Sequence, residues 1–218
     1  MPVIRRLTSR PAHKDLETGD ILWFPEDRSV TNIRGVSKPN LLSPWGHVGM
    51  VFFKDEEQEK IRDHPVPKEH PRASPYVVEA IKNYDNPTPP PPRKSGVREI
   101  SYNDWFQDFD TFWHGRIKKP SARGPVALSP PEQMALVTEA LHHLRRPYSG
   151  LREPSLNRYT WFSCSKLILV AAYDALGITL DGKPGPRRWR HPWARSLKKS
   201  PYIFDVPPPP PPPPPPLP

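Results

Sequence analysis

Residues 161–177 read WFSCSKLILVAAYDALG, and this stretch decides the fold. From Cys164 onward its apolar spacing predicts a helix, and Gly177 is a typical C-terminal stop. Ser163 directly precedes the run and can act as the N-cap, because its hydroxyl can accept a backbone N–H of the first turn. The chain therefore places its single cysteine at the first residue of a predicted helix.

A second helix is predicted just before this one in the chain. Pro130 and Pro131 suit a first helical turn, where proline loses no hydrogen bond. Apolar residues then recur at steps of three and four, and Pro147 is expected to end the helix. These apolar positions are Met134, Val137, Leu141 and Leu144.

The first half of the chain has the short apolar runs that are typical of strands. We expect the charged segment 54–74 to be a surface insertion. Residues 86–95 are expected to form a loop, because proline has no N–H to give to a sheet. Strands followed by helices indicate an α+β domain. The expected strands are 20–24, 47–53, 76–81, 97–100 and 111–117, with a last one near 202–206.

The chain has 218 residues, 35 of them proline, which suits one domain and a tail. We assign residues 1–206 to the domain and 207–218 to the tail. Residues 207–216 are ten consecutive prolines, which adopt an extended polyproline II helix. Such a tail is either a spacer or a ligand for SH3, WW or profilin-like domains.

Charge and hydropathy narrow the class of protein. The net charge of +9 favours an anionic partner, yet no nucleic-acid motif accompanies it, so we expect no nucleic acid. The sequence contains no run of about 18 apolar residues, so we expect no membrane span. The N-terminus has no apolar signal core, so we expect synthesis in the cytoplasm without a cleaved signal. One cysteine excludes an intrachain disulfide and a multi-cysteine zinc site, and we expect no metal or cofactor.

Three residues are candidates for thiol chemistry. A helix N-terminus and a nearby imidazole both favour the reactive thiolate, which suits Cys164. His47 opens an apolar strand after a turn and could be the base. Glu79 lies within an apolar strand, where a charge needs a partner. The residues alone leave other readings open: a core cysteine, a surface histidine, and a glutamate on the solvent face of an edge strand.

The order of several motifs resembles the permuted NlpC-type cysteine hydrolases, the YiiX-like group related to lecithin retinol acyltransferase-like enzymes. The resemblance spans residues 16–206. Gly46, Ser149 and Ser163 stand where the family has serine, aspartate and tyrosine. The segments that carry the resemblance are 19–22 (GDIL), 46–49 (GHVG), 76–80 (YVVEA), 147–149 (PYS) and 161–165 (WFSCS).

The resemblance implies a permuted papain-like fold, in which an antiparallel sheet packs on a few helices and the nucleophile begins a helix. It implies that Cys164 is the nucleophile, that His47 is its base and that Glu79 orients the imidazole. The amide of Cys164 would help to stabilise the oxyanion. The aromatic residues in or beside the motifs are expected to bind substrate: Trp45, Tyr148 and Trp161.

The expected activity is hydrolysis of an amide bond in peptidoglycan peptide, without a cofactor. The missing signal then points to an antibacterial effector exported by a secretion machine to a target-cell periplasm, with an immunity protein as a further partner. One alternative is a lipid hydrolase or acyltransferase that works through a thioester. The other is a non-enzymatic protein whose polyproline tail recruits partners.

Overall fold

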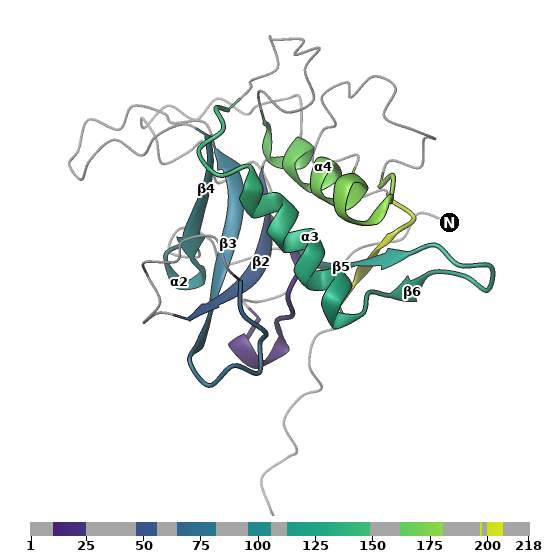
Figure 1. Ribbon diagram of the computed structural model, residues 1–218, viewed down its shortest axis with the longest axis horizontal. Helices are drawn as coiled ribbons and strands as arrows, with labels where there is room; N and C mark the ends of the chain where they lie inside the picture. The colour runs from purple at the N-terminus through teal and green to yellow at the C-terminus, as the bar shows by residue number, and fades with distance from the viewer. Residues whose placement is uncertain are drawn as a thin grey trace, which may run out of the picture.

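The computed structural model describes residues 11–24, 47–55, 65–81, 96–105, 113–148, 162–180, 197 and 200–206. Strands come first along the chain and the two longer helices follow, as expected for an α+β domain (Figure 1). The elements are η1 (His13–Asp15), β1 (Ile21–Phe24), β2 (His47–Asp55), β3 (Ala73–Ile81), β4 (Gly96–Ser101), α2 (Tyr102–Trp105), β5 (Trp113–Lys119), β6 (Val126–Ala127), α3 (Pro130–His142), α4 (Cys164–Leu176) and β7 (Ile203–Asp205).

The strands form one antiparallel sheet in the order β4-β3-β2-β1-β5-β6, and β7 also pairs with β5. The longest pairing joins β2 to β3, from Gly49↔Glu79 to Asp55↔Ala73. The expectation that 54–74 is wholly a surface insertion is therefore wrong at both ends. Lys54 pairs with Ser74 in the sheet. The sheet tolerates its charge because the buried ammonium group lies 2.7 Å from Oε1 of Glu99 on β4.

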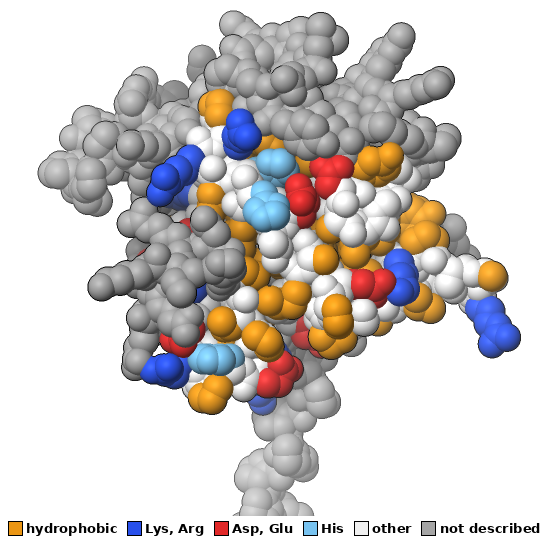
Figure 2. Space-filling model, viewed as in Figure 1, with side chains coloured by type: hydrophobic (Ala, Val, Ile, Leu, Met, Phe, Trp, Pro, Cys, Tyr) orange, Lys and Arg blue, Asp and Glu red, His pale blue; other side chains and the backbone are white. Residues whose placement is uncertain are grey.

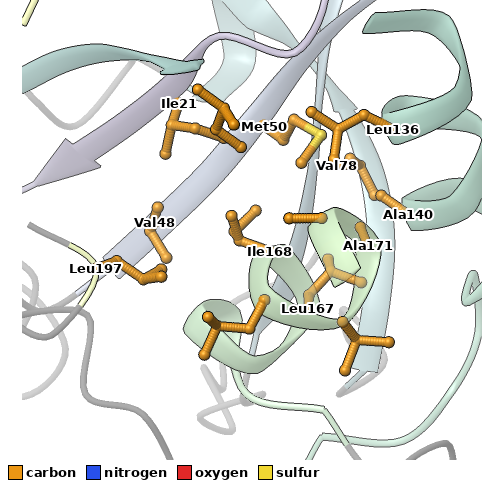
Figure 3. Packing of buried hydrophobic residues seen from close by; sticks show 14 of the residues in the cluster. Ile21, Val48, Met50, Val78, Leu136, Ala140, Leu167, Ile168, Ala171 and Leu197 are labelled. Atoms are coloured by element: carbon orange, nitrogen blue, oxygen red, sulfur yellow. The ribbon is translucent and has the colours of Figure 1, made fainter. Parts of the chain in front are cut away.

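Helices α3 and α4 cover one face of this sheet. Every second residue of β2 faces them, beginning with Val48 and Met50. Ile168 and Ala171 of α4 pack into the same cluster (Figure 3). Each fully buried Val, Ile or Met side chain contributes about 1.5–3 kcal/mol through burial, so the interface with α4 is a main source of stability.

The boundaries of α4 agree with the sequence analysis. Ser163 is the N-cap, and its hydroxyl accepts the backbone N–H of Lys166 at 3.3 Å. Gly177 takes the left-handed conformation at φ 68°, which a glycine adopts without strain. The single cysteine is therefore the first residue of a capped helix that packs on the sheet.

Helix α3 begins as expected but ends early. Ser129 and Glu132 form a capping box around the first turn. The helix ends at His142 rather than near Pro147, because the backbone of the next residues pairs with β4 instead. The N–H of Arg145 donates to the carbonyl of Val97, and the N–H of Val97 donates to the carbonyl of Arg146.

The opposite face of the sheet carries a smaller apolar cluster that includes α2. This short helix is not among the elements expected from the sequence. Trp105 is 5% exposed and enters the cluster from α2. The other fully enclosed members are Leu16, Leu22, Val51, Phe53, Val77 and Tyr102.

A buried ionic group joins the start of β1 to β5. Asp20 is 1% exposed and lies 2.6 Å from Nε2 of His114, which is itself buried. Arg116 donates from Nε to the other carboxylate oxygen of Asp20 at 2.8 Å. The Gly19–Asp20 segment therefore has a structural role in this chain, since it ties two neighbouring strands together.

Several expectations lie outside the described residues. They include the polyproline tail 207–218, residues 56–64 of the charged segment and the proline-rich stretch 86–95. Residues 111 and 112 of the expected strand also lie outside the described residues, and strand β5 is described from Trp113 onward. Among the described residues, no helix has the length and apolar character needed to cross a membrane.

Candidate active site

His47 is the first residue of β2 and pairs with Phe24 of β1. Strand alternation puts it on the same face as Gly49 and Val51, the face that carries α2. Its side chain is 18% exposed, so the ring lies at the border between the interior and solvent. This position fits the expectation that the ring projects from the end of an apolar strand.

Glu79 lies beside His47 on the neighbouring strand. Glu79 pairs with Gly49, so His47 is its diagonal neighbour on the same face, a distance that long side chains can bridge. Nε2 of His47 lies 2.5 Å from Oε2 of Glu79. Glu79 is 1% exposed and β3 lies between β2 and β4, which excludes the reading of a solvent-facing residue on an edge strand.

Two further donors hold the carboxylate of Glu79. Arg98 of β4 donates to Oε1 from Nε at 2.7 Å and from Nη2 at 2.5 Å. Trp105 of α2 donates from Nε1 to Oε2 at 2.6 Å. Burial raises the pKa of Glu79, but the charges of His47 and Arg98 and the hydrogen bonds from His47 and Trp105 outweigh this and lower the pKa to about 2. Glu79 is therefore charged at neutral pH.

The sulfur of Cys164 completes the arrangement. Cys164 is 7% exposed, and its side chain is hydrogen-bonded to the His47 ring. Because Nε2 of His47 faces Glu79, the nitrogen left for the sulfur is Nδ1. Burial lowers the pKa of His47, but the charge of Glu79 and the hydrogen bond to Cys164 outweigh it and raise the pKa to about 10.

The structure thus brings together the three residues that the sequence analysis singled out. An imidazole held between a thiol and a buried carboxylate can accept the thiol proton and keep it. The N-terminus of α4 adds a favourable field for a negative sulfur. The cap on this helix uses the amide of Lys166, not that of Cys164, as its donor. A thiol, an imidazole and a carboxylate are therefore within reach of each other.

The expected substrate-binding residues are only partly described. Tyr148 forms an isolated parallel bridge with Phe162, two residues before Cys164, and packs against the core. The structure therefore brings Tyr148 next to the segment that contains Cys164. Trp45 and Trp161 lie outside the described residues, as do Gly46 and Ser149.

A group that could hold a metal ion lies between α3 and α4. Glu139, His143 and Asp174 offer ligand atoms that all lie within 4.8 Å of one another. Nε2 of His143 is 3.5 Å from Oε1 of Glu139, and the ring of His143 packs against Phe162 at 4.4 Å between centroids. Figure 2 shows histidine and acidic side chains next to each other over these helices.

Comparisons with known proteins support the fold. No family model matches the chain, and no curated protein matches it in sequence. Among solved structures, the chain is similar to the crystal structure of the metalloprotein YiiX from Escherichia coli O157:H7, described as DUF1105. The TM-score is 0.53 at 17% sequence identity, and the match covers 88% of this chain and 97% of that one. The chain therefore has a YiiX-like α+β fold, with an antiparallel sheet and few helices.

Proposed function

We propose that this protein is a cysteine hydrolase in which Cys164 is the nucleophile, His47 the base and Glu79 the group that orients the imidazole. One observation carries the proposal. The ring of His47 is hydrogen-bonded to Cys164 on one side and to a buried, charged Glu79 on the other. A core cysteine or a surface histidine would need neither partner.

The mechanism follows from the charges of the site. With a pKa of about 10, His47 holds a proton at neutral pH. Its positive charge favours a negative sulfur beside it. The thiolate of Cys164 attacks a substrate carbonyl, and the amide at the start of α4 stabilises the oxyanion. His47 then protonates the leaving group. Water resolves the resulting thioester, and the thiol is regenerated.

The proposed substrate is an amide bond in peptidoglycan peptide. The net charge of +9 suits an anionic polymer, and the resemblance to NlpC-type enzymes points to the same substrate class. In this proposal the protein acts as an exported effector. If an acceptor other than water resolves the thioester, the same site performs acyl transfer, which is the activity of the lipid-directed alternative.

The decisive experiment incubates the purified protein with peptidoglycan and identifies new fragments by mass spectrometry. We expect cleaved peptides with wild type and none with Cys164→Ser. A parallel reaction with a phospholipid vesicle tests the alternative, since release or transfer of a fatty acyl group would replace the amide proposal. Equal product yields from wild type and Cys164→Ser in both reactions would refute both the amide proposal and the lipid-directed alternative.

The thiol chemistry can also be tested without a substrate. Because the chain has one cysteine, iodoacetamide reports on Cys164 alone. A thiolate stabilised by His47 should react at pH 6 at a rate close to that at pH 9, since the thiolate is the reactive form. His47→Gln should lose most of the rate at pH 6 and keep the rate at pH 9. A wild-type rate that falls from pH 9 to pH 6 as steeply as that of an ordinary free thiol would contradict the proposed site.

A second candidate function is the binding of a divalent metal ion. The similar structure is titled a metalloprotein, and the group of Glu139, His143 and Asp174 fits such an ion. One imidazole and two carboxylates are donors that several divalent metals accept. A bound ion would neutralise the two carboxylates and tie α3 to α4.

Calorimetric titration of metal-free protein with Zn²⁺ or Mn²⁺ tests this second function. We expect one equivalent to bind, and binding to be lost in Glu139→Gln and in Asp174→Asn. Glu69→Gln, which changes an exposed acid outside the group, is the matched control. Cys164→Ala should bind as wild type does. Binding that depends on Cys164 instead would place the metal at the proposed catalytic site.

A further inference from the structure

The carboxylate of Glu79 is held by more than its histidine. Its Oε2 is shared between Nε2 of His47 at 2.5 Å and Nε1 of Trp105 at 2.6 Å. Its Oε1 receives Nε and Nη2 of Arg98 at 2.7 and 2.5 Å. Donors on both oxygens prevent the carboxylate from rotating away from the imidazole. A two-point contact from an arginine adds geometric as well as electrostatic control.

The charges around Glu79 are not balanced by His47 alone. Arg98 is a permanent cation, and its side chain is 20% exposed. Without a cation at this place, a carboxylate that is 1% exposed would gain from taking up a proton whenever His47 is neutral. The guanidinium and the indole N–H both favour the charged form of Glu79. They therefore keep the negative charge in place through a catalytic cycle in which His47 gives up its proton.

The indole reaches this position because residue 49 has no side chain. Gly49 pairs directly with Glu79 in the sheet and lies under Trp105. A Cβ built at Gly49 would come within 2.4 Å of Cγ1 of Val77 and 3.0 Å of Cζ2 of Trp105. Real Cβ atoms do not approach a neighbour at the shorter distance, so a side chain at residue 49 would displace Val77, and at 3.0 Å it would also press on the indole.

We propose that Arg98 and Trp105 are positioning residues of the hydrolase site, and that the missing side chain of Gly49 leaves room for Trp105. They act through Glu79 and touch neither the sulfur nor a substrate carbonyl. This inference rests on the proposed function. It assigns to the β3–β4–α2 side of the site a role that neither the motifs nor the resemblance specified.

The test measures the rate of Cys164 alkylation by iodoacetamide at pH 5 divided by the rate at pH 9. The ratio reports how well the thiolate is stabilised, and differences in access to the sulfur cancel. We expect Arg98→Gln and Trp105→Phe each to lower the ratio at least about two-fold, because a smaller share of the sulfur is then thiolate at pH 5. Arg98→Lys keeps the charge and should recover part of the loss.

Two matched controls separate positioning from general packing. Tyr102→Phe removes a hydrogen bond from the same helix and the same apolar cluster, where the hydroxyl donates to the carbonyl of Pro11. Lys54→Gln breaks the ion pair with Glu99, beside Arg98 on β4. Both controls should keep the wild-type ratio, even if they lower the melting temperature.

Gly49→Ala supplies an independent route to the same effect. It should lower the ratio in the same direction as Trp105→Phe, because the added methyl group presses on the indole as well as on Val77. In the Trp105→Phe background, the added alanine should lower the ratio little further, since the interaction is already lost. Additive losses would mean that Gly49 acts through something other than Trp105.

The outcomes distinguish this inference from the proposed function. A low ratio in wild type itself would overturn the thiolate–imidazole site. A high wild-type ratio that persists in folded Arg98→Gln and Trp105→Phe would overturn only the positioning role. Circular dichroism of each variant at both pH values establishes that the comparison is made between folded proteins.

Discussion

Glu79→Gln is the single substitution that tests the centre of the site most directly. Glutamine keeps the size of the side chain but has one acceptor oxygen where the carboxylate has two. In the wild type, Oε1 serves Arg98 and Oε2 serves His47 and Trp105. The amide nitrogen must therefore face one of these donors. The variant loses the negative charge, and it also places the NH2 group of the glutamine against an N–H donor of a neighbouring side chain.

The pKa shifts set the size of the effect. The pKa of His47 rises from 6.5 to about 10, and that of Glu79 falls from 4.5 to about 2. We take the smaller shift, that of Glu79, because the shift of His47 also includes the hydrogen bond to Cys164. At 1.36 kcal/mol per unit this gives about 3 kcal/mol, within the range for breaking a buried pair. For a chain of this size, a loss of about 3 kcal/mol lowers the melting temperature by roughly 6–12 °C.

The dependence on pH has a definite sign. The pKa of His47 is raised on folding, so its contribution to stability is complete below pH 6.5 and is lost as the pH rises through about 10. The pKa of Glu79 is lowered, so its contribution is present above pH 4.5 and is lost as the pH falls through about 2. The difference in melting temperature between wild type and Glu79→Gln should therefore be largest between about pH 4.5 and 6.5.

Two measurements check this prediction. Thermal melts of both proteins from pH 3 to pH 10 give the difference in stability, and NMR of ¹⁵N-labelled histidine gives the titration of His47, assigned with His47→Gln. We expect the midpoint of His47 to fall by about two units or more in Glu79→Gln. The reasoning is refuted if this midpoint stays near 10, or if the difference in melting temperature is the same at every pH.

Three further predictions follow from the same structure. Cys164→Ala and His47→Ala should each abolish hydrolysis while the chain stays folded. The double variant should be no less active than either single variant, because the pair acts as a unit. Near wild-type turnover in either single variant would exclude the proposed catalytic pair. Deleting residues 207–218 should leave the melting temperature unchanged, whereas a cut before Tyr202 should lower it, because β7 buries Ile203 against β5; equal melts for both truncations would show that β7 contributes nothing. Asp20→Asn should lower the free energy of unfolding in urea by about 1.5–3 kcal/mol, because it weakens the hydrogen bonds of the buried His114 and of Arg116, which keeps Glu17 as its second carboxylate; a loss below about 1 kcal/mol would contradict that role.

Local signals were enough to predict the helix that carries the cysteine. Ser163 as N-cap, the apolar run and Gly177 as the left-handed stop all lie within one segment, so their effect does not depend on the rest of the chain. His47 and Glu79 could be selected for a similar reason. A histidine at the start of an apolar strand and a carboxylate inside one are unusual wherever the strands pair.

The pairing of distant segments decided the rest. Arg98 and Trp105 carry no signal of their own, because their role depends on β4 lying beside β3 and on α2 folding over that face. The early end of α3 has the same cause, since pairing of Arg145 and Arg146 with Val97 competes with continued helix.

The sequence by itself determined the α+β class, the capped helix with Cys164 at its start, and the three candidate residues. Only the tertiary structure decided which donors surround Glu79, and that Val77 and Trp105 leave little space for a side chain at residue 49. It also decided that Glu139 and His143 meet Asp174 between two helices. The physical reason is that capping and periodicity act over a few neighbouring residues, whereas strand register and helix packing bring together side chains that are far apart in the chain.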